Sequence, residues 1–136
     1  MYITRTQVED KLPPPILLDA LDDDGDGVED PGRFDSLVGT ASQEVDGYLA
    51  GLFTVPFLDP APPKVCQAAL CLMLYGIYRR RGVADKDNSY YHDVVFWREH
   101  LQKVANRELP FDASMVKAFT PGAAITEDVS VNAQST

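Results

Sequence analysis

The chain has 136 residues, the size of one domain, and a chain of this length buries about two thirds of its unfolded surface. Its 12 basic and 21 acidic residues give a formal net charge of −9, which argues against binding to a nucleic-acid backbone or an anionic lipid surface. The first ten residues lack the basic and then apolar pattern of a secretory signal. We therefore expect action inside the cell that makes the protein, or in an assembly built there.

Two short helices are predicted before residue 22. Residues 6–9, TQVE, have the form of a capping box, so a helix is expected to begin at Thr6. Three consecutive prolines at 13–15 end it, because proline lacks an amide donor and restricts the residue before it. Residues 16–21 form a second short apolar helix or turn.

The segment DDDGDGVED at 22–30 resembles the first half of a calcium loop. Four carboxylates at the spacing of oxygen ligands make it a candidate Ca²⁺ site, namely Asp22, Asp24, Asp26 and Asp30. The closing half is missing, since Arg33 stands where a bidentate Glu is required, and Glu29, Asp35, water or another subunit would have to complete the coordination. The alternative is a turn built from Asp and Gly; crowded aspartates repel one another without a cation, which keeps weak divalent binding open.

Asp30 and Pro31 are suited to be the N-cap and first residue of a long amphipathic helix. Its apolar residues follow helical spacing and predict one buried stripe, formed by Phe34, Leu37, Val38, Ala41, Val45, Tyr48, Leu49 and Leu52. Residues 53–63, FTVPFLDPAPP, contain too many prolines for regular structure and predict a stiff connector. Its apolar side chains are expected to contact the core or a neighbouring subunit: Phe53, Val55, Phe57 and Leu58.

The most apolar stretch, residues 62–82, predicts a central helix packed on every side. Between Val65 and Tyr78 it is about 14 residues long, whereas a membrane crossing needs about 20. Cys66 and Cys71 lie about 140° apart on this helix and are interpreted as buried thiols, not a disulfide or zinc site. Arg79, Arg80 and Arg81 at its end either compensate the helix dipole in solvent or dock an acidic partner.

A last amphipathic helix, capped by Asp87 or Ser89, is expected to reach about Asn106. His92 and His100 lack the spacing of a metal pair and are interpreted as solvated or locally bonded. Residues 109–136 lose helical periodicity, and the alternation in 125–131 permits a strand only beside a partner. The prediction is thus an all-α bundle over residues 1–108, followed by an extended C-terminal arm over 109–136.

Taken together, several segments resemble the Mu-like phage neck-protein family. They are the opening MYITRTQVEDKL, the acidic LDDDGDGVED, the stretch EVDGYLAGLFTVPF and the helix PPKV…LYGIYRRRG. The match covers residues 1–109 and departs from the family pattern at the prolines 13–15. The resemblance implies a virion head-tail connector, assembled in the host cytoplasm, that forms a dodecameric ring below the portal protein and above a tail-side neck or tail-terminator protein. Genome DNA would pass through its channel without specific binding, and no membrane is involved.

Two functions of different classes are therefore carried forward. The first is a structural adaptor without enzymatic activity or an obligatory cofactor, and the second is a small calcium-binding helical module. No nucleophile motif, phosphate loop or His-carboxylate constellation supports an enzyme. The residues predicted to contact partners are Arg79, Arg80, Arg81, Phe53, Val55, Phe57, Leu58, Phe111, Ile125, Val129 and Val131.

Overall fold

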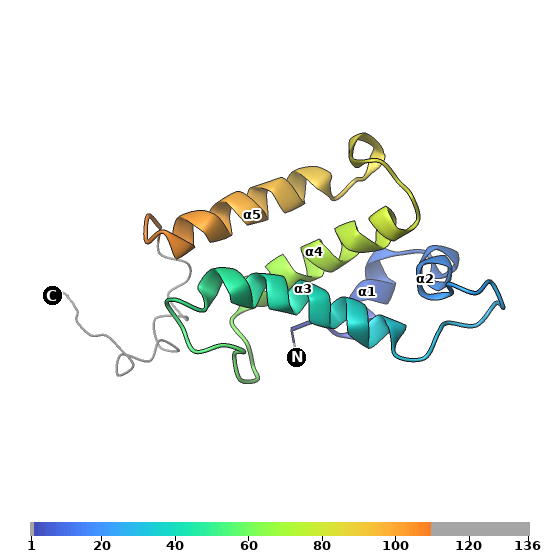
Figure 1. The fold of residues 1–136 in the computed structure, drawn as a ribbon, viewed down its shortest axis with the longest axis horizontal. Coiled ribbons are helices and arrows are strands. Elements are labelled where there is room, and N and C mark those ends of the chain that lie inside the picture. The colour runs from blue at the N-terminus through green and yellow to red at the C-terminus, as the bar shows by residue number, and fades with distance from the viewer. Residues whose placement is uncertain (1, 110–136) are drawn as a thin grey trace, which may run out of the picture.

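The computed structural model describes residues 2–109. Within this range the chain forms five α-helices, one short 3-10 helix and no strand, which confirms the all-α prediction (Figure 1). The elements are α1 (Arg5–Lys11), α2 (Pro14–Leu21), α3 (Arg33–Leu49), α4 (Pro63–Arg80), η1 (Asp85–Asp87) and α5 (Tyr91–Ala105). The strand proposed at 125–131 and all of the C-terminal arm beyond Leu109 lie outside the described residues.

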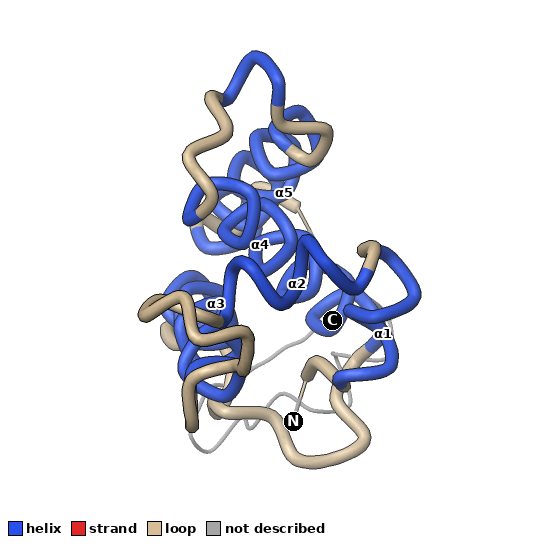
Figure 2. The backbone as a smooth tube through the Cα atoms, turned by 90° about the vertical axis from the view of Figure 1, so that its right-hand side faces the viewer, coloured by secondary structure: helices blue, strands red, loops and turns tan. Residues whose placement is uncertain are grey.

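Helix α4 is the centre of the fold, as its composition predicts. It packs against α1, α2, α3 and α5, and α3 also packs against α5. Figure 2 shows α4 between α3 and α5, with α1 and α2 beside it. The buried side chains point from α4 in all directions: Val65, Ala68, Ala69, Cys71, Leu72, Met73, Leu74, Tyr75 and Ile77. Cys66 and Cys71 are free thiols, half-buried and buried respectively, and burial raises the pKa of Cys71 to about 11.

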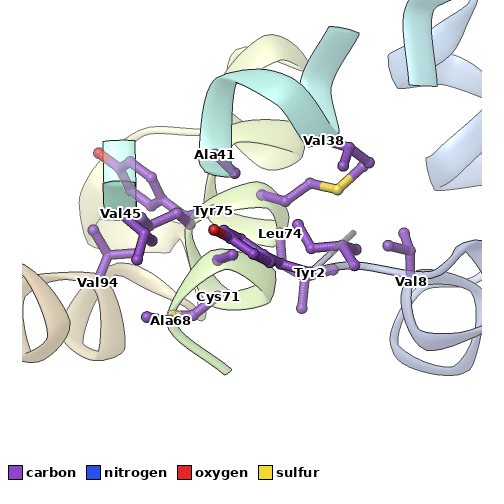
Figure 3. Packing of buried hydrophobic residues seen from close by; sticks show 14 of the residues in the cluster. Tyr2, Val8, Val38, Ala41, Val45, Ala68, Cys71, Leu74, Tyr75 and Val94 are labelled. Atoms are coloured by element: carbon purple, nitrogen blue, oxygen red, sulfur yellow. The ribbon is translucent and has the colours of Figure 1, made fainter. Parts of the chain in front are cut away.

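One core joins the helices to the N-terminal segment (Figure 3). Tyr2 is buried in it, and its hydroxyl makes two hydrogen bonds to segments far away in the sequence. It accepts one from the backbone N–H of Phe57 at 2.7 Å and donates one to Oδ1 of Asp46 at 2.7 Å. Burial raises the pKa of this hydroxyl above its usual value. The first residues of the chain therefore fasten the connector and α3 to each other.

Helix α1 begins two residues earlier than expected. Thr4, not Thr6, is the N-cap: its Oγ1 accepts from the N–H of Gln7 at 3.2 Å, and the Gln7 side chain accepts from the N–H of Thr4 at 2.9 Å. Both T-x-x-E/Q registers are present in the sequence. The observed register leaves Glu9 free to pair with Arg5 one turn away, while Val8 is fully buried.

The prolines at 13–15 separate α1 from α2 without a long loop. Pro13 is the N-cap of α2, and Pro14 and Pro15 occupy its first turn, where a missing amide costs no intrahelical hydrogen bond. Helix α2 therefore starts two residues before the predicted position. Leu17 and Leu21 are buried.

The start of α3 also differs from the prediction. Its N-cap is Gly32, with φ of 77°, and not Asp30. The carbonyl of Asp30 accepts from the N–H of Arg33 at 3.1 Å, while the Asp30 carboxylate bonds the N–H of Asp23 at 3.0 Å. The Asp30 side chain is thus committed to the preceding loop. At its other end α3 stops at Leu49, before the predicted Leu52.

The connector between α3 and α4 is irregular, as predicted, with cis peptide bonds before Pro56 and Pro60. Phe57 is buried, and its ring lies 5.9 Å from that of Phe53. Leu58 behaves differently, since 88% of it is exposed. Part of the connector therefore seals the core and part faces outward.

The N-cap of α5 is Tyr90, not Asp87 or Ser89, and no side chain caps the helix. Just before it, the buried side chain of Asn88 accepts from the N–H of Tyr90 at 3.0 Å through Oδ1 and donates to the carbonyl of Tyr75 at 3.2 Å through Nδ2. Asn88 thus ties the start of α5 to α4. Among the described helices, none combines the length and apolarity needed to cross a bilayer.

The two hydrogen bonds of Tyr2 generate a stability prediction. Replacing Tyr2 by phenylalanine leaves the buried N–H of Phe57 without its acceptor, so we expect the free energy of unfolding to fall by about 1 to 3 kcal/mol. Urea denaturation followed by circular dichroism measures this change. The matched control is Tyr48→Phe, since the Tyr48 hydroxyl has no hydrogen bond within residues 2–109. Equal losses in both variants would contradict the assignment.

Candidate functional site

The loop between α2 and α3 is organised around the carboxylate of Asp22. Its Oδ1 accepts from the backbone N–H groups of Gly25 at 2.9 Å and Asp26 at 3.2 Å, and its Oδ2 accepts from Gly27 at 2.8 Å. Gly25 and Gly27 have φ of 75° and 83°, which glycine adopts at little steric cost. The alternation of Asp and Gly thus produces a tight turn, because Asp side chains bind nearby backbone amides.

The four predicted ligands come together in this turn. One carboxylate oxygen from each of Asp22, Asp24, Asp26 and Asp30 lies within 4.8 Å of the others. Calcium binds oxygen ligands at about 2.4 Å, so oxygens on opposite sides of an ion are about 4.8 Å apart. The cluster therefore has the dimensions and the donor type of a Ca²⁺ site. Its carboxylates are at most half-buried.

The crowded carboxylates shift one another's pKa values. The pKa of Asp24 is raised, chiefly because its carboxyl group shares a hydrogen bond with the Asp22 carboxylate. For Asp22, desolvation is the largest single cause and raises the pKa, but the N–H donors of Gly27, Gly25 and Asp26 and the bond to Asp24 together outweigh it and leave the pKa lowered. These opposite shifts reflect the crowding of charges that a bound cation would neutralise.

Neither Glu29 nor the residue at the position of the missing Glu contributes to the cluster. Glu29 forms a bidentate ion pair with Arg5 of α1, with 2.8 Å between Nη1 and Oε1, and this pair lowers the pKa of Glu29. Arg33, at the position of the missing Glu, forms an ion pair of 2.8 Å with Asp23. Of the alternatives for completing the coordination, Glu29 is therefore engaged with Arg5 in this structure. The cluster offers four side chains from one half of a loop.

Two of the three arginines at the end of α4 bind within the chain. The Nε of Arg80 donates to the carbonyl of Ala20 at 3.1 Å, and its Nη2 donates to Asp23 at 2.5 Å. The Nε of Arg81 donates to Asp19 at 2.8 Å. Arg79 instead has its guanidinium 5.8 Å from the ring centre of Tyr75. From the sequence, these arginines could either lie in solvent or dock an external acidic partner. In the structure, Arg80 and Arg81 instead hold α2 and the acidic loop against α4.

The acidic loop and the arginine cluster, predicted as separate features, thus form one ionic network. Asp23 is shared by Arg80 of α4 and Arg33 of α3. These arginines bring positive charge next to the four carboxylates of the neighbouring turn. Residues 57 positions apart in the sequence meet here, and no local motif marks their pairing. Only the position of α2 against the end of α4 brings them together.

Helix α5 carries a surface that sequence reasoning did not single out. Phe96 is 57% exposed, and its ring stacks on that of His100 at 5.6 Å with an interplanar angle of 14°. Trp97 lies edge-on to both rings. The sequence did contain a signal for this surface, because Phe96 falls outside the apolar face of the predicted helix. Exposed aromatic side chains of this kind are enriched at protein interfaces.

A second residue of α5 that was missed is Arg98. Its guanidinium binds Glu44 of α3 at 2.9 and 3.2 Å and lies 5.6 Å from the ring centre of Tyr75 of α4. The bond to Glu44 raises the pKa of Arg98. Arg98 and Glu44 both line a groove between the three long helices.

These features define a small all-α protein with a buried central helix, an acidic turn held by arginines, and exposed apolar side chains on the connector and on α5. Residues 2–124 match the family model described as Bacteriophage Mu, Gp36, and the chain belongs to that family. No curated protein and no solved structure matches it significantly. The resemblance to a Mu-like phage protein is thereby confirmed, and the chain is a bacteriophage structural or assembly protein.

The contacts of Arg80 lead to a prediction about the fold. Arg80→Ala removes donors from the Ala20 carbonyl and from Asp23, and we expect the free energy of unfolding to fall by about 1 kcal/mol, a modest value because the ion pair is partly exposed. Arg79→Ala, which removes a ring contact, is the matched control and should cost about 0.5 kcal/mol or less. Urea titration measures both, and an equal loss in the two variants would disprove the bracing role of Arg80.

Proposed function

We propose that the chain is a head-tail connector of the virion, an adaptor that forms a ring between the portal protein and the tail. The observation that carries this proposal is membership of the Bacteriophage Mu, Gp36 family over residues 2–124. The sequence features that resemble phage neck proteins lie within the same range. The role is structural and not catalytic, and the protein would act in the virion neck after assembly in the host cytoplasm.

Exposed apolar side chains support a role in assembly. Leu58 on the connector is 88% exposed and Phe96 on α5 is 57% exposed. A ring is built from heterologous contacts, in which one surface of each subunit meets a different surface of the next. Leu58 with its half-buried neighbours Phe53 and Val55, and Phe96 with Trp97, provide two such surfaces on different segments.

The charge of the chain is consistent with a channel through which DNA moves. The formal net charge of −9 opposes lasting contact with phosphates, whose binding depends on Lys and Arg. Among the described residues, five arginines are already paired with carboxylates: Arg5, Arg33, Arg80, Arg81 and Arg98. Pairing within the subunit further reduces its attraction for the DNA backbone, so the genome would pass without specific binding.

The partners follow from this position. The portal protein lies on one side of the ring and a tail-side neck or tail-terminator protein on the other, with further copies of the chain, in a dodecamer, as lateral neighbours. Arg79 is the residue of the arginine cluster best suited to an external acidic partner, because it has no carboxylate partner among residues 2–109. The C-terminal residues Phe111, Ile125, Val129 and Val131 are proposed to supply additional contacts.

The neck role predicts a specific assembly defect. A phage with an early stop codon in this gene should produce heads and tails that do not join, since each is built without the connector. Electron microscopy of the lysate counts joined particles, and mass spectrometry of purified wild-type virions should find the chain at a fixed low copy number.

The control is expression of the wild-type chain from a plasmid, which should restore joined particles. A lysate in which heads and tails join normally without the chain would overturn the neck assignment. So would its absence from purified virions.

A second candidate function is calcium binding by the acidic loop. The observation that favours it is the approach of four carboxylate oxygens to within 4.8 Å. Half of a calcium loop is present, so the affinity is expected to be weak, with a dissociation constant of about 10⁻⁴ to 10⁻³ M. If the chain were a calcium sensor, its affinity for Ca²⁺ would instead be micromolar, and binding would cause a large conformational change.

Calorimetric titration with CaCl₂ tests this candidate. Asp24→Asn should weaken binding by about tenfold or more, because it removes one charged ligand, whereas Asp35→Asn, outside the cluster, is the matched control. Because the pKa of Asp24 is raised, protons compete with the ion, and the affinity should fall as the pH is lowered. Binding unaffected by Asp24→Asn would place the ion elsewhere, and no binding in the wild type would reject the site.

A further inference from the structure

The connector between α3 and α4 holds one large apolar side chain outward. Leu58 is 88% exposed, more than any other large apolar side chain of the described residues. Its position is well defined, because the adjacent Phe57 is buried and Pro56 and Pro60 restrict the backbone on either side. In this position Leu58 adds little to the stability of its own subunit and is available to another molecule.

Helix α5 presents the largest exposed aromatic side chain. Phe96 is 57% exposed, and its ring is held by the stack on His100 at 5.6 Å and by the edge of Trp97 at 5.5 Å. An aromatic ring that is already fixed by its neighbours loses little conformational freedom when a partner covers it. The α5 face is therefore suited to receive an aliphatic side chain such as leucine.

Each of these apolar side chains has one charge beside it, and the two charges have opposite signs. Asp59, the only charged residue of the connector, is exposed and follows Leu58 directly. On α5, Lys103 is exposed and has no carboxylate partner among residues 2–109. It lies near the aromatic pair, since the pKa of His100 is lowered by burial and then by the charges of Lys64 and Lys103.

The helical positions place Lys103 in line with Phe96. Seven residues are close to two turns, so the two side chains are about 20° apart around α5. Asp93 and Glu99 lie about 60° to either side of Phe96. Helical side chains lean toward the N-terminus, which brings the ammonium group of Lys103 toward the aromatic pair. A carboxylate next to the residue that covers Phe96 would therefore meet a cation along the helix axis.

The two surfaces lie on opposite sides of the subunit. Figure 1 shows α5 along one long side of the bundle and the connector on the other, with α3 between them. They cannot meet within one copy. A contact between them joins one surface of a subunit to a different surface of the next, and such a heterologous contact repeats from copy to copy and can close into a ring.

We propose that the connector of one copy packs on α5 of a second copy, with Leu58 against Phe96 and His100 and with Asp59 paired to Lys103. The proposal rests on the proposed function, for which it names the lateral contact of the ring. The partner is a second copy of this chain, because its two surfaces match each other in apolar character and in charge.

Carbodiimide cross-linking of purified wild-type virions tests this pairing, because the reagent joins a carboxylate to an amine only where the two are in contact. Mass spectrometry should recover Asp59 linked to Lys103 in a product that contains two or more copies of the chain. Lys103→Arg retains the charge but has no reactive amine, so the link should be lost while particles still form. Lys11→Arg, on α1, is the matched control and should leave the link unchanged.

The outcomes separate this contact from the neck role. Virions that contain the chain and give its other cross-links, but not this one, would overturn the pairing and leave the neck role intact. Recovery of the link from dilute monomeric chain would also overturn the pairing, since the two residues would then meet within one copy. Absence of the chain from virions would overturn the neck role and this contact with it.

Substitutions at the apolar contact provide an independent measurement. Leu58→Glu and Phe96→Glu change exposed side chains, so the helical circular dichroism signal should be retained. Each would bury a charge between copies, and joined particles in the complemented stop-codon phage should fall by at least about tenfold. Val28→Glu, at a position 63% exposed on the acidic loop, is the matched control and should join normally. Wild-type numbers of joined particles with both Leu58→Glu and Phe96→Glu would overturn the proposal.

Discussion

The fold depends on the need to remove α4 from water on every side. A helix with one apolar stripe needs one cover, but α4 buries residues such as Val65, Leu74 and Ile77 in different directions. Helices α3 and α5 cover two sides, and α1 with α2 covers the part near the arginines. Apolar burial of this kind supplies most of the stability of a small domain. The other helices are placed around α4 so that they meet this requirement.

Polar contacts then determine how the covering elements lie on α4. Tyr2 joins the connector to α3, Asn88 joins the start of α5 to α4, and Arg80 joins α2 and the acidic loop to the end of α4. Each contact links segments that the apolar core alone would leave free to slide. The acidic loop is a special case, because its crowded carboxylates repel one another while Asp23 of the same loop is paired with Arg33 and Arg80.

The surface left over by this packing is where we propose that partners bind. Leu58 and the aromatic side chains around Phe96 remain exposed on separate segments. A structural protein of a phage particle needs several such surfaces, since it contacts more than one neighbour. Family membership and the distribution of these surfaces point in the same direction.

The sequence by itself determined the helices and the central position of α4, because periodicity and overall apolarity report directly on burial. It also identified the four aspartates that meet in one turn, because that turn is local. It misplaced the caps of α1 and α3, where Thr4 competes with Thr6 and Gly32 with Asp30, since neighbouring registers have similar local energies. Only the tertiary structure decided that Arg80 meets Asp23, that Arg98 meets Glu44 and that Phe96 faces outward. Those outcomes depend on how whole helices are oriented against one another, which no local pattern encodes.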